Sequence, residues 1–185
     1  MKTAFKTALL LLAITFTATQ LSAQCDNMRE YKGMTATLSK GQAAGQSFLV
    51  TDDCKTGKHL SAIQINHQSQ WETNVTLKIY KGQSTKPANL MYTQENVIIP
   101  DATKSGNKHT IKLGSGTGKL LVESCHMYTF TIQPTNNNFR WNGEYNDKAQ
   151  PGIALWPNNG DMFVPNGYDY LYKLTYANMA DTGNQ

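Results

Sequence analysis

From about Gly45 onwards, hydrophobic and polar residues alternate in short runs separated by turn-forming residues. Val75, Leu77 and Ile79 alternate with polar neighbours at a period of two, the spacing of a half-buried β-strand. Beyond the N-terminal apolar run, no window of useful length has the spacing of an amphipathic helix. We therefore expect strands at residues 46–50, 60–66, 75–80, 89–92, 109–113, 119–123, 127–133, 139–141, 153–156 and 171–176.

This pattern predicts an all-β fold, a two-sheet antiparallel β-sandwich of jelly-roll type. The expected strands outnumber those of a minimal immunoglobulin sandwich, and the Cys-Trp-Cys spacing of that fold is absent. We expect residues 45–177 to form the sandwich. Residues 24–44 are predicted to be an N-terminal arm or an edge strand, and residues 178–185 a frayed tail.

Residues 1–23 have the features of a secretory signal peptide. Lys2 and Lys6 supply the positive region, Ala8–Phe16 the apolar region, and Leu21-Ser22-Ala23 a small-residue cleavage site. We expect the mature chain to begin at Gln24 and to be secreted, periplasmic or on the cell surface. No later segment approaches the length of apolar sequence that crosses a bilayer, so no transmembrane segment is predicted.

The charge pattern argues against nucleic acid as a partner. The chain has 17 Lys and Arg against 13 Asp and Glu, a formal net charge of +4. Two of the lysines belong to the signal peptide, so the mature chain is nearly neutral. The remaining lysines are scattered singly, whereas a nucleic-acid-binding protein concentrates them in a basic stripe.

The three cysteines, Cys25, Cys54 and Cys125, all lie in the predicted mature chain, where an oxidising compartment favours disulfides. At most one bridge can form within the chain. We favour Cys54–Cys125 because each lies just outside an apolar strand, while Cys25 with either partner stays open. Lipidation of Cys25 is disfavoured because Gln24 stands where a lipobox has a small residue.

A family resemblance rests on six segments taken in order: GQSFLV, LSAIQI, VTLKIYKG, HTIKL, HMYTFTIQP and YDYLYKLTY. Their succession between about Gly45 and Tyr176 resembles the accessory jelly-roll β-sandwich domains of secreted bacterial proteins, some of which are similar to carbohydrate-binding modules. The resemblance implies a fold more strongly than a ligand, and it implies a non-catalytic role.

The most suggestive polar stretch is Asn136–Asp161, which combines aromatic rings with amide and charged side chains. Sugar recognition uses this mixture, because a flat ring covers the apolar face of a pyranose while amides bind its hydroxyl groups. Trp141 is expected near a strand end or in a loop, and Trp156 either in the binding site or in the core. The candidate ligand-binding residues are Trp141, Arg140, Asn142, Tyr145, Trp156 and Trp71.

Catalytic and metal signatures are weak. The histidines and cysteines never fall at a metal-ligand spacing, so no metal is predicted at a catalytic site and no cofactor is expected. A structural calcium ion remains an option through Asp52, Asp53, Asp161 and Asp169. The carboxylates fall mostly in turn-like stretches, which does not favour a paired-carboxylate hydrolase.

These observations favour a secreted, non-catalytic module that binds a glycan or surface polysaccharide. A second hypothesis is a structural or adhesion protein that assembles with other surface proteins through exposed strands or Cys25. A small glycoside hydrolase or lyase ranks third.

Overall fold

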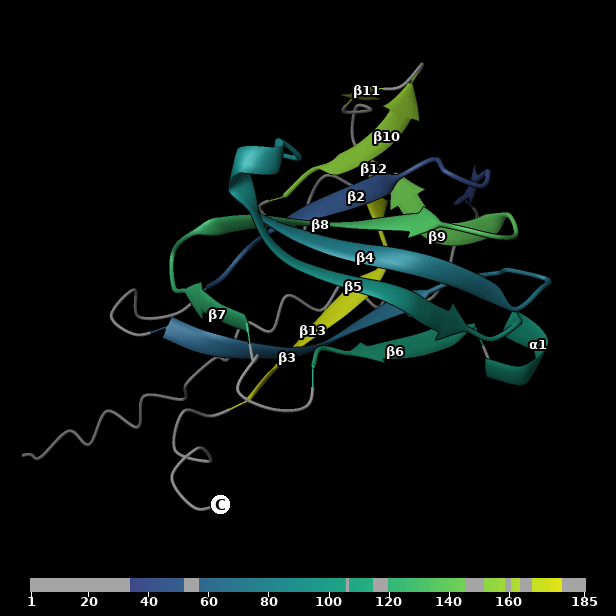
Figure 1. Cartoon of the computed structure of the whole chain (residues 1–185), viewed down its shortest axis with the longest axis horizontal. Coiled ribbons are helices and arrows are strands. Elements are labelled where there is room, and N and C mark those ends of the chain that lie inside the picture. The colour runs from purple at the N-terminus through teal and green to yellow at the C-terminus, as the bar shows by residue number, and fades with distance from the viewer. Residues whose placement is uncertain are drawn as a thin grey trace, which may run out of the picture.

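The fold is seen in a computed structural model of the 185-residue chain (Figure 1). It describes residues 34–51, 57–105, 107–114, 120–145, 152–158, 161–163 and 168–177. About two thirds of this part is β-strand, and the helical elements are a 3₁₀ turn at Pro87–Asn89 and a short helix α1 at Ala102–Ser105. The predicted all-β antiparallel sandwich is confirmed. The predicted signal peptide and tail lie outside the described residues.

One layer is a six-stranded antiparallel sheet. Its order is β11-β10-β2-β8-β4-β5, so strands that are early in the sequence lie beside strands that are late in it. The strands are β2 (Ala44–Leu49), β4 (Thr73–Lys81), β5 (Leu90–Ile99), β8 (Met127–Pro134), β10 (Ala154–Asn158) and β11 (Asp161–Phe163).

The opposing strands form two smaller sheets. One has the order β13-β3-β6, with β7 also paired to β3, and the other has the order β1-β9-β12. In the orders β2-β8-β4-β5 and β13-β3-β6, most neighbouring strands are distant in sequence, as is typical of Greek-key sandwiches, of which the jelly roll is one type. These strands are β1 (Met34–Leu38), β3 (Gly57–Asn66), β6 (Lys108–Lys112), β7 (Leu120–Glu123), β9 (Phe139–Tyr145), β12 (Tyr168–Tyr170) and β13 (Tyr172–Ala177).

Leu171 joins the two smaller sheets. Its N–H donates to the Asn142 carbonyl of β9 at 2.9 Å, and its carbonyl accepts from the Asn66 N–H of β3 at 3.1 Å. His67, directly after β3, forms an isolated bridge with Trp141 of β9. The segment from Tyr168 to Ala177 therefore runs across both smaller sheets and connects them.

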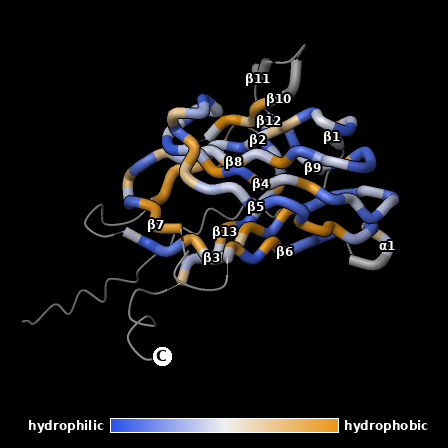
Figure 2. The backbone as a smooth tube through the Cα atoms, viewed as in Figure 1, coloured by the Kyte–Doolittle hydropathy of each residue, from blue (hydrophilic) through white to orange (hydrophobic). Residues whose placement is uncertain are grey.

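The core lies between the layers and follows from the alternation of side chains. Val75, Leu77 and Ile79 of β4 are fully buried, as are Phe130 and Ile132 of the neighbouring β8. Figure 2 shows hydrophobic and hydrophilic residues alternating along the strands. Burial of such side chains is the main free-energy gain of a fold of this kind, at about 25 cal/mol per Å² of apolar surface.

A β-bulge explains why the hydrophobic pattern of β3 is imperfect. Leu60, Ile63 and Ile65 are all fully buried although a period of two does not relate the first to the others. In the pairing with β13, Thr175 lies opposite Ala62, whereas the next residue of β13 lies opposite Leu60. The extra residue between them returns the buried side chains to the same face.

The structure also contains strands that the sequence pattern did not indicate. β5 continues to Ile99, and β11 and β12 were not expected. β1 occupies residues that were expected to be an arm or an edge strand; it lies at the edge of its sheet and buries Ala36 and Leu38 in the core. The sandwich therefore includes residues from Met34 onwards.

Cys125, in the turn between β7 and β8, takes part in a disulfide bond. Its N–H donates to the Val50 carbonyl at 2.7 Å. Gly57 pairs with the residue two positions before Cys125. Val50 and Gly57 are therefore both hydrogen-bonded to the chain at or beside Cys125. Cys54 and Cys25 lie outside the described residues, so the favoured pairing with Cys54 stays a prediction.

We expect Cys54→Ser to abolish the disulfide and Cys25→Ser to leave it intact. Peptide mapping by mass spectrometry without reductant would identify the linked pair. Because a cross-link restricts the unfolded chain, its loss should lower the free energy of unfolding by about 2–4 kcal/mol. A linked peptide that contains Cys25 would show that the favoured pairing is wrong.

His67 is a fully buried histidine beside the bridge between β3 and β9. Its ring stacks on Phe139 with ring centres 5.9 Å apart. Burial is the main cause that lowers its pKa from 6.5 to about 4; His109 lowers it further and Asp101 opposes the shift. His67 is therefore neutral in the folded protein near neutral pH.

Acid should destabilise the fold through His67. Between pH 6.5 and 4 the unfolded chain binds the proton more readily than the folded chain, so stability falls as the pH falls. We expect this site to contribute a loss of up to about 3 kcal/mol, measured by urea denaturation across that range. His67→Gln should flatten the pH dependence across this range relative to the unmodified chain. Equal slopes in the variant and the unmodified chain would contradict this assignment.

Candidate functional site

Trp141 lies in the centre of the core. Its exposed fraction is 0%, and its ring stacks on Tyr170 with ring centres 4.1 Å apart and an angle of 17°. The indole N–H donates to the Leu171 carbonyl at 3.3 Å. The prediction that Trp141 is available to a ligand is therefore wrong. β9 is the central strand of its sheet, between β1 and β12. Because side chains alternate between the two faces of a strand, Phe139 and Trp141 share one face, and both are buried in the core.

Asn142 is also unavailable to a ligand. Its exposed fraction is 0%, its Nδ2 donates to Asn66 Oδ1 at 2.8 Å, and its Oδ1 accepts from Thr35 Oγ1 at 3.0 Å. Both polar groups of this amide are thus used to join β9 to β1 and β3. The prediction that Asn142 binds a ligand is wrong, because a buried amide needs these internal partners.

The other predicted residues of this stretch do not assemble into a surface site with Trp141. Arg140 is half-buried, and the side chain of Tyr145 lies outside the described part. Trp156 is half-buried and packs edge-to-face on Tyr168 with ring centres 5.0 Å apart. Of the two roles considered for Trp156, the structure therefore favours the core.

Trp71 has the opposite environment. It lies between β3 and β4, and its exposed fraction is 66%, the highest among the exposed large hydrophobic residues of the described part. Gln70 and Glu72, on either side of it, are also exposed. Trp71 is the predicted ligand-binding residue whose indole ring the structure leaves open to solvent.

Hydrogen bonds hold the loop that carries Trp71. The Trp71 carbonyl accepts from Thr73 Oγ1 at 3.1 Å. Ser69 Oγ accepts from the Arg140 N–H at 3.0 Å, and the Gln68 N–H donates to the Arg140 carbonyl at 2.9 Å. The Ser69 carbonyl accepts from the first residue of α1 at 2.8 Å. The loop is therefore tied to β9 and α1 before Trp71 and held by Thr73 after it.

An asparagine-rich loop lies against the segment that carries Trp71. Asn137 Nδ2 donates to the carbonyl of Glu72, the residue after Trp71, at 2.8 Å. Asn136 Oδ1 accepts from the Asn74 N–H at 2.8 Å, which fixes the loop to the start of β4. Asn136, Asn137 and Asn138 are all exposed. We call Gln70, Trp71, Glu72 and Asn136–Asn138 the Trp71 surface.

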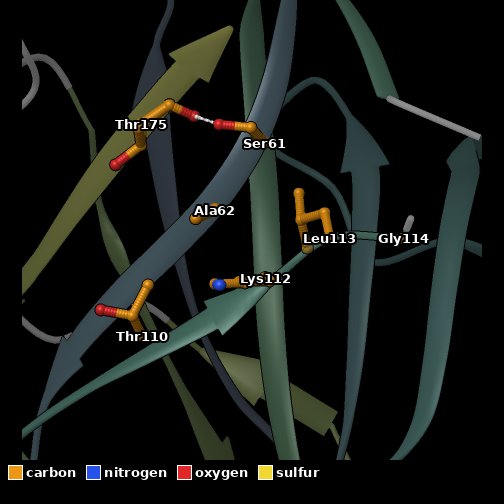
Figure 3. Close-up of a pocket in the computed structure, with 7 residues that line it drawn as sticks. All are labelled: Ser61, Ala62, Thr110, Lys112, Leu113, Gly114 and Thr175. Carbon is orange, nitrogen blue, oxygen red and sulfur yellow. Dashed lines mark hydrogen bonds between the residues drawn. The ribbon is translucent and has the colours of Figure 1, made fainter. Parts of the chain in front are cut away.

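A second feature is a hollow on the face of β13, β3 and β6 (Figure 3). It has a volume of about 480 Å³. Ala62 lies opposite both Thr175 and Lys112, so a small side chain is flanked by two longer ones. Ser61 Oγ closes one side by donating to the Thr175 carbonyl at 2.9 Å. The hollow has no aromatic ring in its lining, unlike the Trp71 surface.

Two of the described carboxylates have structural partners. Asp169 is buried and its Oδ1 accepts from Gln46 Nε2 at 2.9 Å, while Glu123 is exposed and lies 3.2 Å from Lys81 Nζ. Within the described ranges, no group of three or more His, Cys, Asp or Glu side chains is placed to hold a metal ion. Asp52 and Asp53 lie outside those ranges, so a calcium site stays a hypothesis.

Across the part of the chain that the structure describes, no helix is long and apolar enough to cross a membrane. Comparison with known proteins finds no matching family model, and no curated protein matches the chain.

The asparagine side of the Trp71 surface was not identified from the sequence. Asn136–Asn138 belong to the polar stretch Asn136–Asp161, but the aromatic ring expected beside them was Trp141 of the same stretch. The partner in space is Trp71, more than sixty positions earlier in the sequence. The signal that was available is the density of amides at Asn136–Asn138, which is typical of a loop that binds polar groups.

Removing the Trp141 ring should lower stability far more than removing the Trp71 ring. We expect Trp141→Ala to lower the free energy of unfolding by about 3–5 kcal/mol, because it empties a packed aromatic site. Trp71→Ala should change it by less than about 0.5 kcal/mol, because the ring is mainly solvated. Urea denaturation of both variants measures the difference. Similar losses in the two variants would contradict these placements.

Proposed function

We propose that this domain is a non-catalytic module that binds a glycan through the Trp71 surface. The observation that carries the proposal is the exposed indole of Trp71, held beside a loop of three exposed asparagines. The β-sandwich fold agrees with the resemblance to carbohydrate-binding modules, although that resemblance concerns the fold more than the ligand.

The exposure of Trp71 supports a role in binding. Trp141 and Trp156 pack in or against the core, as a large apolar ring normally does. Keeping an indole in water forgoes the free energy of burying it. A ligand with a flat apolar face recovers that free energy, and the C–H face of a pyranose ring has this shape and chemistry.

The rigidity of the loop also supports binding. The bonds from Thr73 and to Arg140 fix the backbone on both sides of Trp71. A loop that is already ordered loses little conformational entropy when a ligand arrives, so more of the contact energy appears as affinity. The Trp71 surface is therefore built as a preformed platform.

The polar groups of the Trp71 surface favour a neutral sugar. Amides both donate and accept hydrogen bonds, as sugar hydroxyl groups do. In the two loop segments, residues 68–72 and 135–140, the one acidic residue is Glu72 and the one basic residue is Arg140. A strongly acidic polysaccharide would need an excess of basic groups. We therefore propose a neutral polysaccharide as the ligand class.

The experiment is binding of the chain from Gln24 onwards to a glycan array and to insoluble polysaccharides. We expect saturable binding that Trp71→Ala weakens by roughly tenfold or more, because a central aromatic contact usually dominates such a site. Raising the salt concentration should have little effect on a neutral ligand.

Two further variants define the result. Leu121→Ala removes another exposed large hydrophobic side chain, on β7, and should bind normally. Asn137→Ala should weaken binding, because it removes the amide that lies against Glu72. Retention of no glycan, or equal binding by Trp71→Ala and the unmodified chain, would refute the proposal.

A further inference from the structure

β5 forms an open edge of the six-stranded sheet. It is ten residues long, Leu90–Ile99, and it pairs with β4 alone (Figure 1). In an antiparallel strand, alternate backbone N–H and C=O groups point away from the paired neighbour. Among the described segments, none forms a backbone hydrogen bond with that outer side of β5. Such an edge is a template for another strand.

Exposed apolar side chains are concentrated on this edge. Of the five exposed large hydrophobic residues in the described part, three are on β5: Leu90 at 41%, Met91 at 40% and Ile98 at 55%. A single exposed apolar residue is ordinary, whereas a group of them along one unpaired strand indicates a contact surface.

The first half of β5 lacks the charges and prolines that usually protect an edge. Leu90–Gln94 contains no charged residue and no proline. Register shifts at Met91 and at Asn96, which has φ of 56°, bound the regular stretch Tyr92–Gln94. The edge strand β6 of the opposing layer carries the exposed Lys108 and Lys112. Lysines on an edge oppose pairing with another chain, so β6 has a protection that Tyr92–Gln94 does not have.

We propose that β5 pairs with β5 of a second copy of this chain, antiparallel and about a two-fold axis. The exposed backbone groups specify a strand as the partner, and a two-fold axis perpendicular to β5 brings the strand against itself in the antiparallel direction. The charges of β5 allow this contact. With Thr93 on the axis, Glu95, the single charged residue of β5, lies opposite Met91 of the copy and not opposite its own counterpart.

This dimer would extend the six-stranded sheet across both copies. It would use a different surface from Trp71, which lies between β3 and β4. The proposal therefore does not depend on glycan binding, and each can fail without the other.

The test is sedimentation equilibrium of the chain from Gln24 over a range of concentrations, with Cys25→Ser present to remove thiol-linked dimers. We expect a reversible dimer. Thr93→Lys, at an exposed position on β5, should weaken association by roughly tenfold or more, because it places two lysines side by side on the axis. Thr110→Lys makes the same change at an exposed position of β6 and should leave the dimer intact.

Hydrogen exchange provides a second measurement. Backbone amides of Leu90–Gln94 should exchange more slowly as the concentration of the unmodified chain rises, and Thr93→Lys should remove that effect. A monomer at all concentrations, or a dimer that Thr93→Lys and Thr110→Lys affect equally, would overturn the proposal.

Discussion

The stack of Trp141 on Tyr170 is the contact on which the rest of the sandwich depends. It joins β9 to β12 within one layer, and Phe130 of β8 brings the opposite layer against it with ring centres 5.5 Å from Trp141. The indole N–H is bound to Leu171, the residue at which the chain passes from one small sheet to the other. The Trp141 side chain therefore packs the two layers together and also connects the two small sheets within one layer.

The alternation of residues was sufficient to predict the class of fold and the location of most strands. Val75, Leu77 and Ile79 behave as a period of two requires. Where the pattern was weaker the reason is local: β3 contains a bulge, and β12 consists of three residues in a stretch rich in turn formers. Bulges and very short strands are fixed by pairing with distant segments, which one sequence does not display.

The candidate site was harder to predict because it depends on contacts far apart in sequence. Trp141 has polar neighbours, Arg140 and Asn142, which suggested a loop. In β9 those neighbours face away from the core, and Asn142 is then covered by Asn66 of another strand. Phe139 and Trp141 have the period of a strand, which agrees with their burial. Trp71 was among the candidate ligand-binding residues, whereas its exposure and its asparagine neighbours required the fold.

The passage of one segment across both small sheets has a consequence for how the domain is made. Residues 168–177 supply β12 and β13, which pair with β9 and β3 respectively. Until this segment leaves the ribosome, β9 and β3 each present an unpaired edge, and the two small sheets are not joined. Contacts between segments so far apart in sequence also form slowly. The growing chain therefore remains open to aggregation until residues 168–177 have been synthesised.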